Sequence, residues 1–287
     1  MKNIIIMISI LIGIVTESNA QLSAMNYKSE GFVAFKASKT YAVKLGNAAY
    51  DAELESAMKD IWKVTSFEMI DLESFKTKIT DPSASFIVPV TIEANGPNQA
   101  YHYIALINGG RKSVKKYGYT DMVAYAPINH WVDENENTDC AFRIRNILQS
   151  MVTAIELVQK NDSWGNTKDV VDHLRKIYQA KAPQIKDRIL LVNAKSVGGK
   201  KMTKEVFGGI YPYKFEFCDR EKIAKAIREK STEYYYLQPG ITLNKSIFVF
   251  DPSNGEVVYF DYSMMGMSIT DDNVEDLVKS IKQTGKK

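Results

Sequence analysis

The sequence predicts an α/β protein built from two tandem copies of one unit, each with the order strand, helix, strand, helix, strand, strand. The first observation behind this prediction is an internal repeat, in which residues 67–88 recur about 148 positions later. The second is that short apolar runs alternate with helical patterns in both halves of the chain. The third is a wide helical apolar stripe between the copies, which predicts a helical hairpin joining them.

The repeat is clearest where residues Phe67–Glu73 align with Phe215–Glu221, which places Asp71 against Asp219. At the same offset, Phe86-Ile87-Val88 aligns with Tyr234-Tyr235-Tyr236. Both aligned aspartates precede a helical pattern, and aspartate is a preferred helix N-cap. One α/β unit is therefore predicted to occur twice.

The chain begins with the features of an export signal. Lys2 is followed by the apolar run Ile4–Val15 and by small residues at Ser18 and Ala20, so we expect cleavage before Gln21 and a periplasmic or secreted mature protein. The apolar run is too short to cross a bilayer as a helix, although an uncleaved anchor remains an alternative. No later segment reaches about 18 uninterrupted apolar residues, so no integral membrane segment is expected after signal removal. The predicted organisation is a signal peptide (1–20), an N-terminal lead (21–40), a first α/β unit (41–132), a helical insert (133–185) and a second α/β unit (186–287).

In the lead and the first unit, turn residues separate the predicted elements. An apolar cluster at 32–35 is expected to form an edge strand. Two helices are expected to begin at Asp51 and Asp71, whose carboxylates can cap them. Strands are expected at 41–45, 66–70, 85–90 and 101–107, and 108–110 reads as a hairpin-type turn.

The second unit repeats this order. Helices are expected over 202–210, after Asp219 and after Thr270. The segment Asp251–Gly255 has the composition of a tight turn, because proline fixes φ and Asn-Gly tolerates positive φ. Strands are expected at 189–192, 214–218, 234–237, 246–250 and 256–260.

Between the units, apolar residues recur with helical spacing. A long helix is expected to start at Thr138 or Asp139 and to run to Val158, and a second apolar stripe covers 170–178. Stripes this wide must be covered, so the two helices are predicted to form a hairpin that packs on the sheets or bridges them.

Composition excludes some classes of function. The formal net charge of +3 is too small to indicate a nucleic-acid partner. The two cysteines, Cys140 and Cys218, can form a disulfide in an oxidising compartment, or both can be buried free thiols. The sequence has no C-x-x-C pair, which argues against a thioredoxin-type redox enzyme.

The order of elements over 41–110 and 189–260, with the turn Asp251–Gly255 before a last strand, resembles the small α/β domains of bacterial envelope proteins. The TolB amino-terminal domain and related outer-membrane-assembly lipoproteins are of this kind. The chain is also similar to uncharacterised exported proteins of Gram-negative bacteria whose mature form begins with Gln after an Ala. The resemblance lies in element order and implies a fold, and no functional residue is carried over from it.

Aromatic residues gather in a stretch with loop character, and they are the candidate binding site. Such rings can stack on sugars or anchor a protein partner, although rings that close a sheet edge would give the same pattern. The candidate binding residues are Tyr117, Tyr119, Tyr125, His130 and Trp131.

No catalytic motif, cofactor or metal site is predicted. His173 near Asp169 lacks a second ligand at metal-binding spacing, and the methionines of 264–267 are better explained as packing than as a copper site. The leading hypothesis is a non-enzymatic protein- or glycan-binding module of the cell envelope. The alternatives are a hydrolase with an unrecognised active site in the cleft between the two units, and a structural protein that only dimerises.

Overall fold

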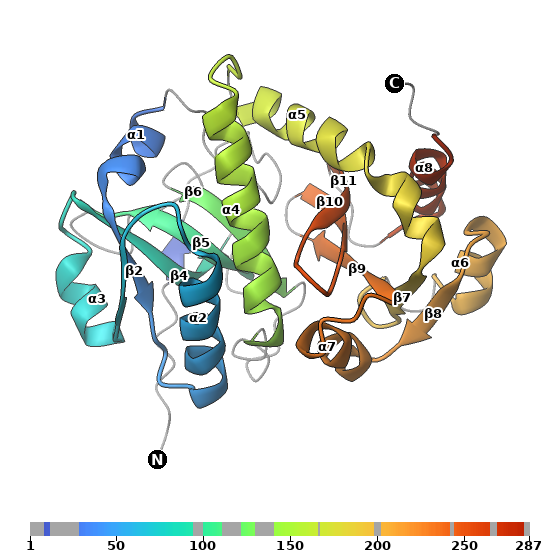
Figure 1. Cartoon of the computed structure of the whole chain (residues 1–287), viewed down its shortest axis with the longest axis horizontal. Helices are drawn as coiled ribbons and strands as arrows, with labels where there is room; N and C mark the ends of the chain where they lie inside the picture. The colour runs from blue at the N-terminus through green and yellow to red at the C-terminus, as the bar shows by residue number, and fades with distance from the viewer. Residues whose placement is uncertain are drawn as a thin grey trace. The chain divides into compact units, whose positions relative to one another are not determined.

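The computed structural model describes residues 9–11, 29–93, 100–110, 122–129, 141–165, 167–197, 202–241, 244–264 and 269–283. The chain divides into two compact units, Met1–Val170 and Val171–Lys287. Each unit contains one mixed sheet flanked by helices (Figure 1). The predicted α/β fold class, with two similar units, is confirmed.

The first unit has a five-stranded path in the order β3-β2-β4-β5-β6. Strand β2 lies parallel to β3 and β4, and β5 and β6 continue the sheet in antiparallel fashion. A short strand β1 (Ser9–Leu11) pairs in parallel with the end of β4. The other elements are α1 (Glu30–Ala37), β2 (Lys39–Val43), α2 (Ala48–Ile61), β3 (Phe67–Ile70), α3 (Leu72–Lys78), β4 (Ala84–Glu93), β5 (Ala100–Asn108), β6 (Met122–Asn129), the 3-10 helix η3 (Ala141–Arg143) and α4 (Ile144–Lys160).

The second unit has the same topology, with the strand order β8-β7-β9-β10-β11. Strand β7 lies parallel to β8 and β9, and β10 and β11 follow in antiparallel fashion. Its elements are α5 (Thr167–Gln179), which begins just before the unit boundary, the 3-10 helix η4 (Ala182–Asp187), β7 (Ile189–Asn193), α6 (Lys204–Ile210), β8 (Phe215–Cys218), α7 (Arg220–Arg228), β9 (Tyr234–Ile241), β10 (Asn244–Phe250), β11 (Val257–Met264) and α8 (Asp271–Lys282).

Strand registers show how closely the two units match. In β4, Pro89 pairs with Ile104, and in β9 Pro239 pairs with Ile247, so proline occupies the same place in both sheets. Both sheets also carry a register shift at the same point between the last two strands, at Leu106/Ile107 and at Val249/Phe250. These shared irregularities support a common origin of the two units, because bulges are specific local features and not a requirement of strand pairing.

The alignment of the third strands needs a correction. Tyr41 of β2 and Leu191 of β7 are equivalent, because they pair with Glu68 and Glu216, which the repeat aligns. On their other side, Tyr41 pairs with Phe86 and Leu191 pairs with Tyr236. Phe86 therefore corresponds to Tyr236, two residues beyond the Tyr234 that the sequence alignment paired with it. The physical reason is the preceding helix, which has 9 residues in α7 and 7 in α3.

Two segments differ from the sequence prediction. Residues 32–35 form part of helix α1, because Ser29 caps the helix by accepting a hydrogen bond from Phe32 N and because Phe32 and Phe35 are both buried. Residues 122–129, which were predicted to lie in a loop, form strand β6 and pair with β5. The first unit therefore has the fifth strand that was predicted only for the second.

The helix after the last strand takes an equivalent place in each unit. Helix α4 follows the last strand of the first unit, as α8 follows the last strand of the second. Helix α4 packs against α2, and α8 packs against α6. The predicted long helix and second helix are thus present as α4 and α5, and the unit boundary falls within α5.

Of the four predicted helix caps, three are confirmed, at Asp71, Asp219 and Thr270, and the two aspartates follow the repeat. Asp71 accepts a hydrogen bond from Ser74 N at 2.7 Å, and Asp219 accepts one from Lys222 N at 3.0 Å. Asp51 was predicted to cap α2, but the cap is Asn47, whose Oδ1 accepts from Tyr50 N at 3.0 Å.

The two equivalent caps provide a matched test. Replacing Asp71 or Asp219 by alanine should each lower the free energy of unfolding by about 1 kcal/mol, because an N–H group of the first helical turn loses its acceptor. Urea unfolding of both variants measures the effect. Asparagine at the same positions retains an acceptor oxygen and is the control. Alanine and asparagine variants of equal stability would contradict the assignment of these caps.

Candidate functional site

Of the five predicted binding residues, the structure describes Tyr125. It lies on β6 opposite Ala105, is 4% exposed and makes an edge-to-face contact with Tyr103, with the ring centroids 5.3 Å apart. Tyr125 therefore belongs to the apolar core of the first unit, and its expected place in an exposed loop is corrected. Tyr117, Tyr119, His130 and Trp131 lie outside the described residues.

The predicted cysteine pair stays a prediction. Cys218 ends strand β8 as a half-buried free thiol, and burial raises its pKa to about 11. Cys140 lies outside the described residues. A thiol with a raised pKa is largely protonated at neutral pH, so Cys218 is not an activated nucleophile.

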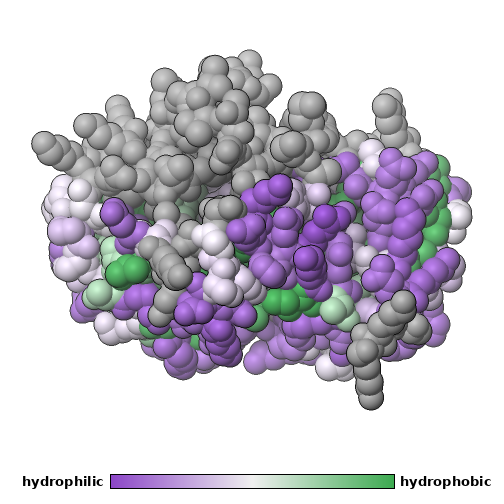
Figure 2. All heavy atoms as spheres, turned by 90° about the horizontal axis from the view of Figure 1, so that it is seen from above, coloured by the Kyte–Doolittle hydropathy of each residue, from purple (hydrophilic) through white to green (hydrophobic). Residues whose placement is uncertain are grey.

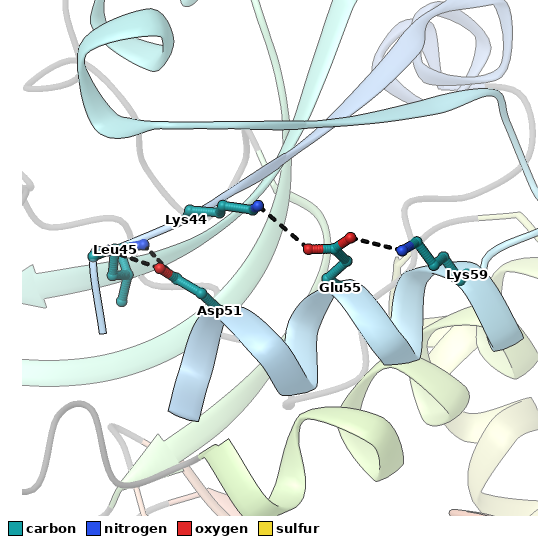
Figure 3. Close-up of polar contacts among 6 residues, drawn as sticks. Lys44, Leu45, Asp51, Glu55 and Lys59 are labelled. Atoms are coloured by element: carbon teal, nitrogen blue, oxygen red, sulfur yellow. Dashed lines mark hydrogen bonds and ion pairs between the residues drawn. The ribbon is translucent and has the colours of Figure 1, made fainter. Parts of the chain in front are cut away.

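The carboxyl end of β2 holds a first group of polar side chains, drawn in Figure 3. Ligands often bind at this end of the strands in α/β sheets. Here the Asp51 carboxylate accepts hydrogen bonds from Leu45 N at 2.8 Å and Gly46 N at 3.0 Å. Glu55 lies between Lys59 at 2.6 Å and Lys44 at 3.3 Å, and these two ammonium groups lower the pKa of Glu55 (Figure 3). Asp51 accepts hydrogen bonds from the loop backbone, and the other three charged groups pair with one another. This group therefore has a structural role.

A second group of polar side chains, which we call the β11 cluster, lies within the second unit. It consists of Asp172 and Arg175 on α5, Lys245 on β10, and Asp261 and Tyr262 on β11. The Asp261 carboxylate is 2.6 Å from Nη2 of Arg175. Asp261 and Lys245 are each 5% exposed, whereas the Arg175 side chain is 39% exposed. The cluster therefore joins two buried charges to a half-exposed cation.

Polar contacts hold α5 and η4 along strand β11. The Tyr262 hydroxyl donates to Asp172 at 3.5 Å, and the guanidinium of Arg175 lies 5.9 Å from the centre of the Tyr262 ring. Between α5 and η4, Lys181 pairs at 2.6 Å with Glu256, the residue before β11. Because β11 is the last strand of its sheet, these contacts also cover an edge that would otherwise be open to pairing with another chain.

The first unit shows that the fold does not require this cluster. Asp261 pairs with Ile247, and in the first unit Ala126 pairs with Ile104, which is the equivalent register position. By the same register, Pro127 stands where the second unit has Tyr262. An alanine therefore satisfies the topology where the second unit buries a carboxylate. Burying a charge is costly unless it is paired, so its presence in one copy points to a function of that copy.

The environment displaces two pKa values of the cluster in opposite directions. Burial raises the pKa of Asp261 above its ordinary value, and the nearby Arg175 opposes that rise without cancelling it. Burial lowers the pKa of Lys245, and the charges of Asp261 and Asp272 oppose that fall. Pairs of titratable groups with displaced pKa values are candidates for functional sites.

The raised pKa of Asp261 determines the direction in which pH changes the stability of the folded protein. A carboxyl whose pKa is higher in the folded than in the unfolded state contributes stability that is full below its unfolded pKa, about 4, and is lost as the pH rises through the folded pKa. Relative to the Asp261→Asn variant, the protein should therefore lose stability as the pH rises from about 4 towards neutrality. Urea unfolding of both proteins across this range measures the difference. If the natural protein instead became more stable relative to the Asp261→Asn variant as the pH rises, the predicted direction would be wrong.

The buried members of the β11 cluster belong to no recognisable sequence motif. One signal was present, since Asp261 interrupts the apolar run Val257–Phe260 within a strand. Arg175 and Lys245 carry no such signal, because lysine and arginine are common on exposed strand and helix positions.

The described residues were also compared with what a membrane span, a metal site or an apolar binding surface requires. None of their helices has the length and apolar character needed to cross a bilayer. No group of three or more His, Cys, Asp or Glu side chains among them is arranged to hold a metal ion. On the face drawn in Figure 2, hydrophilic residues predominate over the described surface, and apolar residues form small separate areas. The large apolar side chains that are exposed among the described residues are Val33 and Val206.

Comparisons with known proteins found no matching protein-family model, no significant match among curated proteins and no significant match among solved structures.

Proposed function

We propose that the chain acts after export as a non-enzymatic binding protein of the cell envelope, and that its protein or glycan partner contacts the half-exposed Arg175–Tyr262 pair. The observation that carries this proposal is the difference between the two units. The second unit keeps a costly charged cluster at a position where the first has Ala126 and Pro127. The predicted aromatic residues Tyr117, Tyr119, His130 and Trp131 remain further candidates for contact with the partner.

The Arg175–Tyr262 pair has chemical properties that favour the binding of a protein or glycan partner. Arginine and tyrosine are enriched among the residues that dominate binding energy at protein interfaces. Here the ion pair with Asp261 holds Arg175 in place, and the contact with Asp172 holds Tyr262. Side chains that are already fixed lose little conformational entropy on binding. The half-buried Tyr262 ring, with the Asp172 carboxylate and the Arg175 guanidinium beside it, also combines an aromatic surface with the hydrogen-bonding groups that a sugar ring needs.

The expected export and the small net charge restrict the class of molecule that can be the partner. The small net charge of +3 and the expected secretion make nucleic acid an unsuitable partner. If the export prediction holds, the protein recovered from the periplasm or medium should begin at Gln21, which N-terminal sequencing and cell fractionation test. Recovery of full-length protein from the cytoplasm would contradict the predicted location.

Binding is tested with the mature chain, residues 21–287, against solubilised envelope proteins and against an array of envelope glycans. Tyr262→Ala should weaken the binding of the true partner about 30-fold, as the loss of a central aromatic contact does. Tyr234→Ala is the matched control, because Tyr234 is also half-buried on a strand with a lysine, Lys222, 5.5 Å from its ring centre. Equal binding by both variants would remove the basis for assigning this surface.

A second candidate function, a hydrolase, is favoured by the opposite pKa displacements of Lys245 and Asp261. A proton donor and acceptor with displaced pKa values are what general acid–base catalysis uses. If this alternative holds, Asp261→Asn should abolish hydrolysis of ester, amide or glycoside substrates that the natural protein cleaves, while Tyr234→Ala should leave it intact.

A further inference from the structure

Strand β4 has two different neighbours along one of its edges. Strand β5 occupies the opposite edge as far as Glu93. Strand β2 pairs in parallel with Ala84–Ile87, and β1 pairs in parallel with Thr91–Glu93. Because β5 already takes the opposite edge, β1 lies on the edge that β2 uses. Strand β1 therefore continues the line of β2, and a gap separates the two strands.

A proline explains the gap. Lys39 N donates to Ser83 O, so the odd-numbered residues of β4 direct their backbone N–H and C=O groups toward β2. After Ile87, the next donor on this edge would be residue 89, which is Pro89 and has no N–H. The ladder between β2 and β4 therefore ends there. Beyond the proline, Thr91 is the first residue on this edge whose N–H can donate to another strand.

The second unit has the same proline, but its edge is satisfied differently. Pro239 occupies the place of Pro89, and the pairing of β9 with β7 ends at Leu237. Nε2 of Gln238 donates to the Pro239 carbonyl oxygen at 2.8 Å, so β9 satisfies this group with its own side chain. Val88 stands where the second unit has Gln238, and a valine side chain cannot donate. Among the described residues, a further strand joins this edge in the first unit and not in the second.

Export removes the strand that covers this edge. Strand β1 lies within the predicted signal peptide, residues 1–20, so cleavage before Gln21 takes it away. The outward backbone groups of Thr91 and Glu93 then lose the partner strand that β1 provides, and such an edge pairs readily with another extended chain. We propose that this part of β4, residues 91–93, binds an extended segment of an exported partner protein in the parallel orientation of β1.

The strand that fills the edge in the full chain indicates the chemistry of the partner's segment. It consists of Ser9-Ile10-Leu11 and lies in a run without charged residues, 3–16. When a strand is added to a sheet, main-chain hydrogen bonds supply affinity and alternate side chains supply specificity. The segment of the partner is therefore expected to be extended, uncharged and mostly apolar. Before cleavage, the leader of the chain itself keeps the edge covered.

This inference deepens the proposed function, on which it rests, because binding at this edge is expected only after export. It also restricts the partner at this edge to a protein, since a glycan has no peptide backbone with which to continue a β-ladder. It does not depend on the Arg175–Tyr262 pair, which lies in the second unit.

The experiment measures by fluorescence anisotropy how a labelled peptide binds to the mature chain, residues 21–287. The peptide contains residues 7–13, with lysines added at both ends for solubility. The mature chain should bind it, and the full chain should bind it about tenfold more weakly, because the leader occupies the edge. A peptide with proline in place of Ile10 lacks a central N–H and should not bind. No binding by the mature chain, or equal binding by the two chains or of the two peptides, would overturn the proposal.

Variants of the mature chain locate the site. Thr91→Pro removes an N–H from this edge and should weaken peptide binding about tenfold, the effect of one lost hydrogen bond. The ladder with β5 stays in place, since Pro89 is already accommodated on the same edge two residues earlier. Ile241→Pro makes the equivalent change in the second unit and should bind the peptide as the natural protein does. Equal binding by the two variants would contradict the assignment to β4.

A cross-link decides the question if Thr91→Pro fails to fold. In a chain whose own cysteines are replaced by serine, Ile92→Cys should form a disulfide with a peptide that carries cysteine at position 10, because these positions face each other in the register of β1 and β4. Thr242→Cys lies at the same distance from Pro239 in the second unit and is the control. Equal rates of disulfide formation at the two positions would overturn the proposal.

This inference and the proposed partner surface can fail separately. Tyr262→Ala tests the surface of the second unit and should leave peptide binding unchanged. If N-terminal sequencing finds residues 1–20 still present on the exported protein, the edge stays filled and this inference is wrong, whereas the Arg175–Tyr262 surface is still tested by its own variants.

Discussion

Replacing Phe207 by alanine should lower the free energy of unfolding by about 3–5 kcal/mol, the range measured for removing a fully buried aromatic ring. Phe207 on α6 is 0% exposed. Its ring contacts Phe215 and Phe217 of β8 and Tyr211 at the end of α6, with centroid separations of 5.0, 5.6 and 5.3 Å. The substitution removes the ring that joins the helix to the edge strand of the second sheet, and the surrounding rings cannot close the space without moving.

The neighbouring residue provides the control. Val206 is 37% exposed on the same helix, so Val206→Ala should change stability by no more than about 0.5 kcal/mol. Urea unfolding followed by circular dichroism measures both variants, and Phe207→Leu, which keeps part of the apolar volume, should fall between them. Similar stabilities for Phe207→Ala and Val206→Ala would show that the aromatic cluster does not hold α6 on the sheet.

The sequence predicted the parts of the fold that depend on local pattern. Asp71 and Asp219 were identified as caps because each precedes a helical apolar pattern, and capping is decided within one turn. The turn at Asp251–Gly255 was identified for the same reason, and Gly255 has the positive φ of 76° that such a turn requires. The repeat added long-range information, because it required the two halves to share one topology.

The elements that were missed depend on tertiary contacts. The apolar run at 32–35 fits a strand or a buried helix, and only its position against the sheet decides between them. Strand β6 contains Pro127, which argues against a strand in sequence, but proline is tolerated on an edge strand such as this one. The β11 cluster arises because α5 lies along β11 and brings Arg175 to Asp261 across 86 positions of sequence. No local pattern indicates that pairing.

Replacing Gly109 by alanine should destabilise the protein by about 3 kcal/mol, at the upper end of the usual effect of overpacking. Gly109 follows β5 and donates a backbone hydrogen bond to Ala84 O at 2.8 Å. A methyl group there would lie well inside contact distance of the Asp81 carbonyl oxygen and 3.1 Å from the carbonyl oxygen of Ala84. Both obstacles are backbone atoms, so no side-chain rotation relieves the overlap and the turn between α3 and β4 must move.

Gly209 on α6 is the control for the general effect of a glycine-to-alanine change. A methyl group there meets no atom within 4 Å, and alanine is favoured over glycine in a helix, so Gly209→Ala should be neutral or stabilising by up to about 1 kcal/mol. The two variants should therefore change stability in opposite directions although the chemical change is identical. Because Gly109 contacts the turn that positions β4, loss of stability in Gly109→Ala should also accelerate amide hydrogen exchange in β4 and β5 more than in β9 and β10. Equal acceleration in both sheets would show that the effect is global unfolding and not release of this turn.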